Sequence, residues 1–115
     1  MQVKLIFVYG TLLQQNYEFY FWRSNASEEA TTKGTLIELS KNLKILSVFG
    51  TEVVTGKVFE FENDDDFKKT LKELDWFENI DQENGLYIRK TIIVSIGNEN
   101  KLAYAYVRRR DFERP

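Results

Sequence analysis

The clearest alternation of apolar and polar residues lies in the last third of the chain. Between residues 86 and 96 every second position is apolar except Lys90, and between residues 101 and 108 larger side chains alternate with Ala and Val. A period of two residues is typical of β-strands, and turn-forming residues at 97–100 separate the two segments. This pattern predicts a β-hairpin over residues 86–108.

Four shorter apolar segments predict further strands in the first half of the chain. They cover residues 3–9, 30–39, 43–49 and 52–61, and turn-forming residues at 40–42 and 50–51 separate the last three. In the fourth segment the alternation slips once at Gly56, which indicates a β-bulge at that position.

Two segments predict helices. Asn16 can cap a short aromatic helix over residues 17–22, and Asn63 with three following Asp residues begins a second helix that runs to Phe77. The order of elements is strand, helix, three strands, helix and two strands. This order indicates an α+β domain built on a small, largely closed barrel or a strongly bent sheet. Residues 1–108 are expected to form this single domain, and residues 109–115 a charged tail.

Composition removes several classes of chemistry. The chain of 115 residues has 16 Lys and Arg against 18 Asp and Glu, a formal charge of −2, and contains neither Cys nor His. Disulfides, thiolate nucleophiles, a Ser-His-Asp triad and zinc sites built on Cys or His are therefore excluded. Proton transfer near neutral pH must use a carboxylate or lysine of shifted pKa, or a tyrosine.

The lengths of the apolar segments bear on the cellular location of the protein. No apolar run approaches the roughly 20 residues that cross a bilayer as a helix. The apolar stretch at residues 3–9 is short and is followed by no cleavage pattern, so it is interpreted as a strand and not as a signal peptide. We therefore expect a cytoplasmic protein without a membrane partner.

One carboxylate lies at an unexpected position of the second predicted helix. At about 100° per residue, Glu78 falls on the apolar stripe formed by Phe67, Leu71 and Leu74. A carboxylate that faces a core must be neutralised, paired or open to a cavity, and burial raises its pKa toward the range used in acid–base catalysis. The alternative is that the helix ends before Glu78, which then turns outward beside a capping Asn79.

A second candidate feature follows the first strand. Tyr9, Gly10, Thr11 and Leu12 come directly after a buried segment. A glycine at the end of a strand lets backbone N–H groups approach a ligand closely, so they can hold a carboxylate or an oxyanion. Most such junctions are simple turns, and the further glycines of a nucleotide-binding loop are missing.

Together these segments resemble the gamma-glutamylcyclotransferase-like family, which includes the AIG2-like proteins. The resemblance rests on FVYGTL at residues 7–12, LDWFE at 74–78, LYIR at 86–89 and AYAYV at 103–107. These segments have the order and spacing of the family and cover nearly the whole chain. The resemblance implies a small six-stranded mixed β-barrel with two or so flanking helices.

The resemblance also implies a reaction and a site. In the family, the α-amine of a γ-glutamyl amine or γ-glutamyl peptide attacks its own γ-carbonyl, releasing 5-oxoproline and an amine, without metal or cofactor. Glu78 would be the general acid and base, and residues 9–12 would form the substrate loop. Tyr87 and Tyr104 are candidates to line the pocket, although half-buried strand tyrosines are more often structural. Arg89, on the face of Tyr87, could pair with a carboxylate.

This chain also departs from the family pattern. Members often have Gly after the helix-end Glu, where this chain has Asn79, a residue that also tolerates left-handed backbone. Many have a Tyr-Pro pair in the middle strands, which residues 43–49 lack.

Two other functions compete with the enzyme. A non-catalytic module could bind a small molecule or peptide in the same barrel, and pairing of Glu78 with Arg89 or its exposure to bulk water would favour that alternative. A nucleic-acid binder is prompted by the basic run at residues 108–110. The net charge of −2 and the terminal position of the run argue against nucleic acid as a partner. The sequence leaves the leaving amine and the oligomeric state open.

Overall fold

A computed structural model describes residues 3–10, 21–41, 43–78 and 85–113. The elements, in chain order, are β1 (Leu5–Val8), β2 (Ala26–Ser40), β3 (Leu43–Glu60), α3 (Asp64–Phe77), β4 (Tyr87–Ile96), β5 (Glu99–Arg108) and the short 3-10 helix η1 (Arg109–Phe112). The expected helix over residues 17–22 falls mostly outside the described residues.

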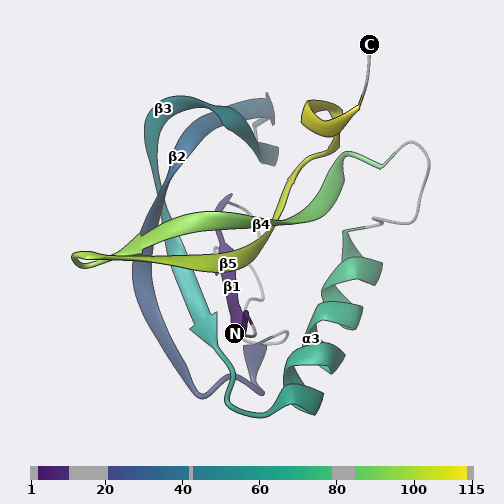
Figure 1. The fold of residues 1–115 in the computed structure, drawn as a ribbon. Helices are drawn as coiled ribbons and strands as arrows, with labels where there is room; N and C mark the ends of the chain where they lie inside the picture. The colour runs from purple at the N-terminus through teal and green to yellow at the C-terminus, as the bar shows by residue number, and fades with distance from the viewer. Residues whose placement is uncertain (1–2, 11–20, 42, 79–84, 114–115) are drawn as a thin grey trace.

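The strands form a closed barrel in the order β1-β3-β2-β4-β5. Neighbouring strands are antiparallel except β1 and β5, which run parallel through the pair Ile6 and Tyr104. Figure 1 shows the long β2–β3 pair curling around the β4–β5 hairpin, with α3 alongside. The prediction of a small mixed barrel is confirmed.

Within the described residues the barrel has five strands and not six. The segments expected at 43–49 and 52–61 form the single strand β3, which continues through Gly50 at a φ of 112°. Glycine adopts this backbone conformation without the steric cost that a Cβ imposes. The chain therefore bends within one strand where a break was expected.

The predicted bulge is in the wrong place. Gly56 pairs regularly with Ala30, and the register of β2 and β3 shifts instead between Gly34 and Thr35, whose partners are Glu52 and Ser47. The absence of a side chain at Gly56 serves packing, because a Cβ there would lie 2.2 Å from the Val8 carbonyl oxygen of β1.

Strand β2 begins at Ala26, four residues earlier than predicted. Its first residues are polar and exposed, and their composition is typical of a loop. They nevertheless form a strand because they pair with residues 57–60 of β3. This pairing is a long-range effect that local sequence does not encode.

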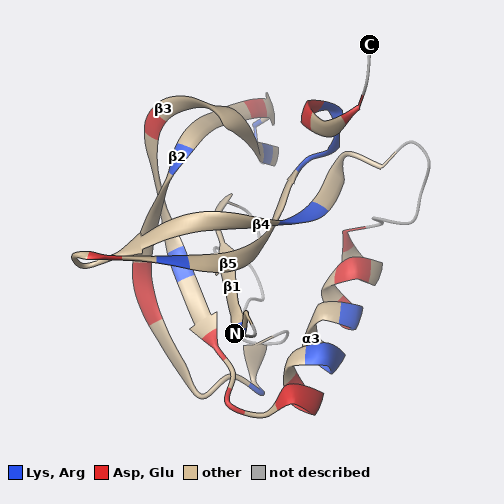
Figure 2. Ribbon diagram, viewed as in Figure 1, with Lys and Arg blue, Asp and Glu red and all other residues tan. Residues whose placement is uncertain are grey.

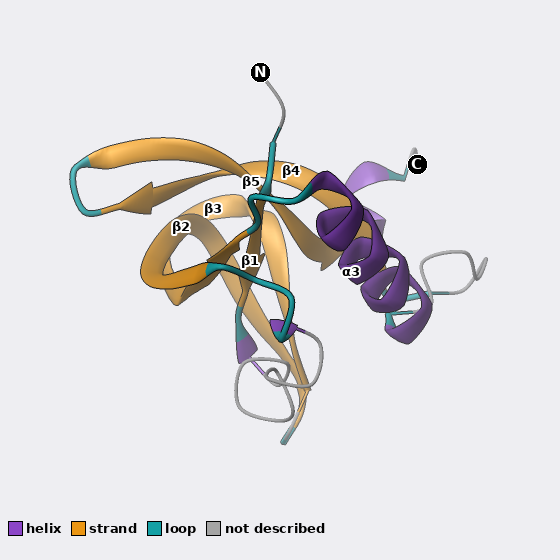
Figure 3. Cartoon of the chain, turned by 90° about the horizontal axis from the view of Figure 1, so that it is seen from below, coloured by secondary structure: helices purple, strands orange, loops and turns teal. Residues whose placement is uncertain are grey.

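Apolar residues pack in two clusters, one on each side of the barrel wall. The barrel interior contains Phe7, Tyr9, Leu46, Val94, Ala103, Ala105 and Val107 among others. The second cluster lies between the barrel and α3 and includes Ile6, Val8, Leu71, Leu74 and Tyr106. Successive residues of β1 and β5 thus alternate between the clusters, as the period of two predicts, and the view in Figure 3 shows α3 beside the sheet.

Helix α3 begins as predicted. The Asn63 side chain accepts a hydrogen bond of 3.0 Å from the Asp66 backbone N–H, and acidic residues fill the first turn. Figure 2 shows this acidic start, with lysines on the following turns. No helix in the described part of the chain is both long and apolar enough to span a bilayer.

Residues 109–112, expected to belong to a charged tail, form η1 against β3. The Asp111 side chain is only 3% exposed. It accepts hydrogen bonds from the Ser47 hydroxyl (2.8 Å) and the Val48 backbone N–H (2.9 Å). These bonds fix the end of β5 to the first half of β3.

Candidate active site

Glu78 immediately follows the last residue of α3. Its backbone N–H donates to the Leu74 carbonyl at 2.8 Å, so the residue caps the helix, which ends at Phe77. The side chain is half-buried, whereas its neighbours Trp76 and Phe77 are exposed. The helix therefore ends before Glu78, as the alternative interpretation of the sequence required. The Glu78 side chain nevertheless does not turn fully into solvent.

Burial raises the pKa of the Glu78 carboxyl to about 7. None of the ion pairs formed among the described residues includes this carboxylate. Its charge acts on two nearby phenols. In both Tyr9 and Tyr87 burial is the main cause of a raised pKa, and the charge of Glu78 adds to it. Glu78 thus shares one partly desolvated environment with two tyrosines.

The Tyr9 side chain connects three strands of the barrel. It follows β1, its hydroxyl donates to the Tyr106 carbonyl of β5 at 2.6 Å, and it accepts from the Leu46 N–H of β3 at 2.9 Å. Both hydrogen bonds are buried, and the pKa of Tyr9 lies far above its ordinary value, chiefly through burial. The hydroxyl is therefore a protonated structural bridge at neutral pH.

Gly10 lies next to the start of β3. Its φ of 63° is in the left-handed region that glycine tolerates, and a Cβ on it would be 3.8 Å from the Lys44 Cβ. Thr11 and Leu12, the other two residues of the expected substrate loop, lie outside the described residues. The structure thus places the first half of that loop beside β3.

The two remaining tyrosine candidates lie in different places. Tyr87 opens β4, and its hydroxyl donates to the Lys44 carbonyl at 3.3 Å. Burial and the charge of Glu78 raise the pKa of Tyr87 to about 12, so this phenol is neutral at physiological pH. Tyr104 packs its ring 5.9 Å from Phe67, near the other end of α3. Tyr9, Gly10, Tyr87 and Glu78 are brought together, whereas the Tyr104 ring contacts Phe67 and the Arg89 guanidinium.

A polar clamp holds the last turn of α3 against the barrel. The Asp75 carboxylate accepts from the Arg89 guanidinium of β4 and from the Tyr106 hydroxyl of β5, both at 2.6 Å. Arg89 also lies 5.4 Å from the ring centroid of Tyr104. Arg89 therefore pairs with Asp75 and not with Glu78. Sequence reasoning missed Asp75, although its position three residues before Glu78, on the partly buried side of the helix, is a usable signal.

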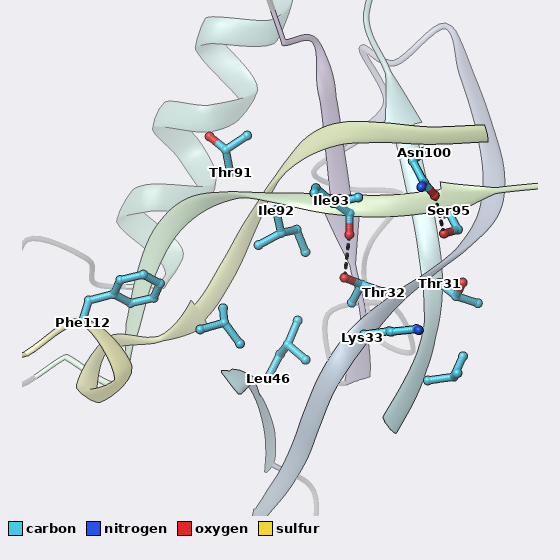
Figure 4. Close-up of a pocket in the computed structure, with 12 residues that line it drawn as sticks. Thr31, Thr32, Lys33, Leu46, Thr91, Ile92, Ile93, Ser95, Asn100 and Phe112 are labelled. Atoms are coloured by element: carbon cyan, nitrogen blue, oxygen red, sulfur yellow. Dashed lines mark hydrogen bonds between the residues drawn. The ribbon is translucent and has the colours of Figure 1, made fainter. Parts of the chain in front are cut away.

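A cleft of about 670 Å³ lies between β2 and β4. Figure 4 shows Leu46, Ile92 and Phe112 around this space, with the Thr32 hydroxyl bonded to the Ile93 carbonyl. Leu46 lines the cleft with its side chain while its N–H holds Tyr9. Sequence reasoning did not anticipate the cleft, because it depends on how far two strands separate and not on any motif.

The arrangement suits proton transfer without a metal. A carboxyl group whose pKa is near 7 is present in both protonation states at neutral pH, so it can accept and return a proton. The surrounding tyrosines are neutral and cannot neutralise it as a cation would.

Comparison with known proteins places the chain in a family. The family model described as gamma-glutamyl cyclotransferase, AIG2-like, matches residues 6–115, so the protein belongs to this family of cyclotransferase-type proteins. The match confirms the resemblance noted in the sequence. A search of curated proteins returned no match.

Solved structures show the same fold. The crystal structure of YkqA from Bacillus subtilis superposes with a TM-score of 0.66 at 24% identity, covering 94% of this chain and 36% of YkqA. The solution structures of At3g28950.1 and At5g39720.1 from Arabidopsis thaliana give TM-scores of 0.64 at 21% and 22% identity. Both superpositions cover 98% of this chain. They cover 66% of At3g28950.1 and 73% of At5g39720.1. The chain thus spans about a third of YkqA.

Proposed function

We propose that this protein is a γ-glutamyl cyclotransferase that releases 5-oxoproline from a γ-glutamyl amine or γ-glutamyl peptide. The α-amine nitrogen of the substrate attacks its own γ-carbonyl carbon. A five-membered lactam ring closes, the bond from that carbon to the leaving nitrogen breaks, and a free amine departs. The reaction is redox-neutral and consumes no second substrate.

Glu78 moves the proton in this scheme. The attacking nitrogen must lose a proton as the new bond forms, and the leaving nitrogen must gain one as the old bond breaks. A single carboxyl group with a pKa of about 7 can perform both transfers in turn. Because attack occurs within one molecule, holding the glutamyl chain in a folded conformation supplies much of the acceleration.

Other residues bind and orient the substrate. In this proposal backbone N–H groups of Gly10, Thr11 and Leu12 hold the α-carboxylate or stabilise the oxyanion that develops on the γ-carbonyl. Tyr87 lines the pocket beside Glu78, with its neutral hydroxyl near Lys44. Tyr104 remains a candidate from the family resemblance, and its packing on α3 favours an indirect role.

The observation that carries the proposal is the half-buried Glu78 carboxylate, which shares its environment with Tyr9 and Tyr87, in a chain that belongs to the cyclotransferase family. The competing binding-module function would be favoured by a Glu78 paired with Arg89. In the structure Arg89 pairs with Asp75, and Glu78 keeps a carboxyl group suited to proton transfer.

A panel of substrates tests the proposal. Purified protein is incubated with γ-glutamyl amino acids, γ-glutamyl-ε-lysine and γ-glutamyl peptides, and 5-oxoproline and the released amine are both quantified by mass spectrometry. We expect the two products in equal amounts from at least one member of the panel. Binding of a panel member without product formation would favour the binding module and overturn the enzymatic proposal.

A further inference from the structure

Lys44 lies against two residues of the candidate active site and has no role in the chemistry described so far. The Tyr87 hydroxyl donates to the Lys44 carbonyl at 3.3 Å. A Cβ placed on Gly10 would lie 3.8 Å from the Lys44 Cβ. The first contact involves the backbone of Lys44, and the second involves the base of its side chain. Lys44 is therefore a direct neighbour of both Tyr87 and Gly10.

Strand β3 places the Lys44 side chain on the face that lines the barrel interior. Successive side chains of a strand alternate between its two faces. Leu46, two residues after Lys44, is buried in the interior cluster together with Tyr9. Lys44 shares this face of β3, but its side chain is exposed. It therefore begins beside Gly10, at the end of the interior face, and reaches solvent.

The Lys44 ammonium is available to an anionic ligand. The ion pairs of the described residues do not include it. Arg89, the cation that the sequence suggested for the site, pairs instead with Asp75. A cation in contact with the candidate site is thus left without a carboxylate partner in the part of the chain that the structure describes.

One acidic residue lies opposite Lys44 in the sheet. Glu38 of β2 is its partner in the register of β2 and β3, and both side chains are exposed. Side chains at directly opposite positions share a face of the sheet, with Cβ atoms about 5 Å apart. The ion pairs of the described residues nevertheless do not join the two. Because exposed pairs contribute little, Glu38 is a weak competitor for the ammonium.

A γ-glutamyl substrate offers two kinds of carboxylate to such a cation. The glutamyl group carries an α-carboxylate, and a leaving amino acid carries a second carboxylate. When Glu78 is ionised, its charge repels both of these groups. An ammonium group at the edge of the site offsets this repulsion and favours substrates that place a carboxylate within its reach.

We propose that Lys44 is a specificity-determining residue whose ammonium binds a carboxylate group of the substrate. The inference rests on the proposed function and adds a residue that selects among γ-glutamyl amines. The carboxylate is that of the glutamyl group or that of the leaving amino acid, and matched substrates distinguish the two. Because Lys44 is exposed, its effect on kcat/KM should be about threefold to fivefold, the size of an exposed ion-pair effect.

Three matched substrates test the inference. The first is γ-Glu-Ala, which carries both carboxylates. The second has the alanine carboxylate converted to the primary amide, and the third has the glutamyl α-carboxylate converted to the primary amide. The released alanine or alaninamide is quantified, because the third substrate yields the amide of 5-oxoproline. The ratio of kcat/KM for γ-Glu-Ala to that for each amide measures the preference for each carboxylate.

Variants assign the preference to Lys44. Lys44→Gln removes the charge and keeps the backbone carbonyl that Tyr87 contacts. In this variant at least one of the two ratios should fall about threefold to fivefold. Lys44→Arg should preserve both ratios, and Lys69→Gln, exposed on α3, should leave them unchanged.

The ratio that falls identifies the carboxylate. A fall in the ratio for the alanine carboxylate assigns Lys44 to the leaving half, and a fall in the other ratio assigns it to the glutamyl half. Turnover with both ratios unchanged in Lys44→Gln, or changed equally in Lys69→Gln, would overturn the inference and leave the proposed function intact.

A binding measurement decides the case in which the wild type releases no amine. The Glu78→Gln variant is titrated with γ-Glu-Ala by calorimetry, alone and in combination with Lys44→Gln. A Kd that rises about threefold to fivefold in the combined variant supports Lys44 as a carboxylate-binding residue although the proposed function fails. Equal Kd values, or no binding of γ-Glu-Ala to Glu78→Gln, would overturn the inference as well.

Discussion

Replacing Glu78 with Gln should stabilise the protein at alkaline pH and have much less effect at acidic pH. In the folded state the pKa of Glu78 is about 7, against an ordinary value of 4.5. The folded protein therefore binds the proton more tightly than the unfolded chain does, and the free energy of unfolding falls as pH rises between these two values. Gln keeps the size of the side chain and removes the charge that burial disfavours.

The magnitude follows from the two pKa values. A change from 4.5 to about 7 corresponds to at most about 3 kcal/mol once the carboxylate is fully charged. Because Glu78 is only half-buried, solvent screens part of this cost. Between pH 5 and pH 8 we expect the stability advantage of Glu78→Gln over wild type to grow by about 1 to 2.5 kcal/mol.

Urea unfolding followed by far-ultraviolet circular dichroism at the two pH values measures this difference. Glu52→Gln is the matched control, because Glu52 is exposed on β3. Its stability relative to wild type should change little with pH. An advantage of Glu78→Gln that does not grow with pH, or a variant less stable than wild type at pH 8, would show that the carboxylate is solvated or paired and would refute the reasoning.

Three further substitutions test the supports of the site. Tyr9→Phe should lower the free energy of unfolding by about 1 to 3 kcal/mol, because the buried Leu46 N–H loses its acceptor; urea titration measures this, and an unchanged midpoint would contradict it. Gly10→Ala should cost about 1 to 2 kcal/mol, since its φ is 63°, and a stabilised variant in thermal melts would exclude that backbone conformation. Asp75→Ala should reduce the rate of 5-oxoproline release and destabilise the fold by about 1 to 3 kcal/mol, because Arg89 loses its partner; wild-type values for both would remove the clamp from the account.

Local patterns predicted the elements that bury one face at a regular period. The hairpin of β4 and β5 and the start of α3 were predicted within two residues, because alternation, turn residues and an acidic cap all agree there. Strand β2 begins earlier than predicted because its first residues are polar and are held by pairing alone. The sequence predicted a break between two strands at Gly50, where the structure has one bent strand. A glycine that permits a bend and a glycine that ends a strand cannot be distinguished by local sequence.

The candidate site also has one part that the sequence predicted and other parts that it did not. Glu78 was visible as a carboxylate at an apolar helical position, and the resemblance to the family gave it a role. The position of Asp75 near Glu78 is a signal for that residue alone. Its partners Arg89 and Tyr106 could not be predicted, because the clamp joins three elements whose relative placement is a property of the closed barrel. The β2–β4 cleft was equally hidden, since it follows from strand separation and leaves no pattern in either strand.

The most direct test of the central claim compares 5-oxoproline release by wild type, Glu78→Gln and Glu52→Gln on the best substrate of the panel at pH 7.5. If Glu78 transfers the proton, Glu78→Gln should lose at least about 100-fold in kcat while remaining folded, and Glu52→Gln should match wild type. A Glu78→Gln variant that retains kcat within a few-fold of wild type would contradict the account, because no carboxylate at position 78 would then be needed for ring closure.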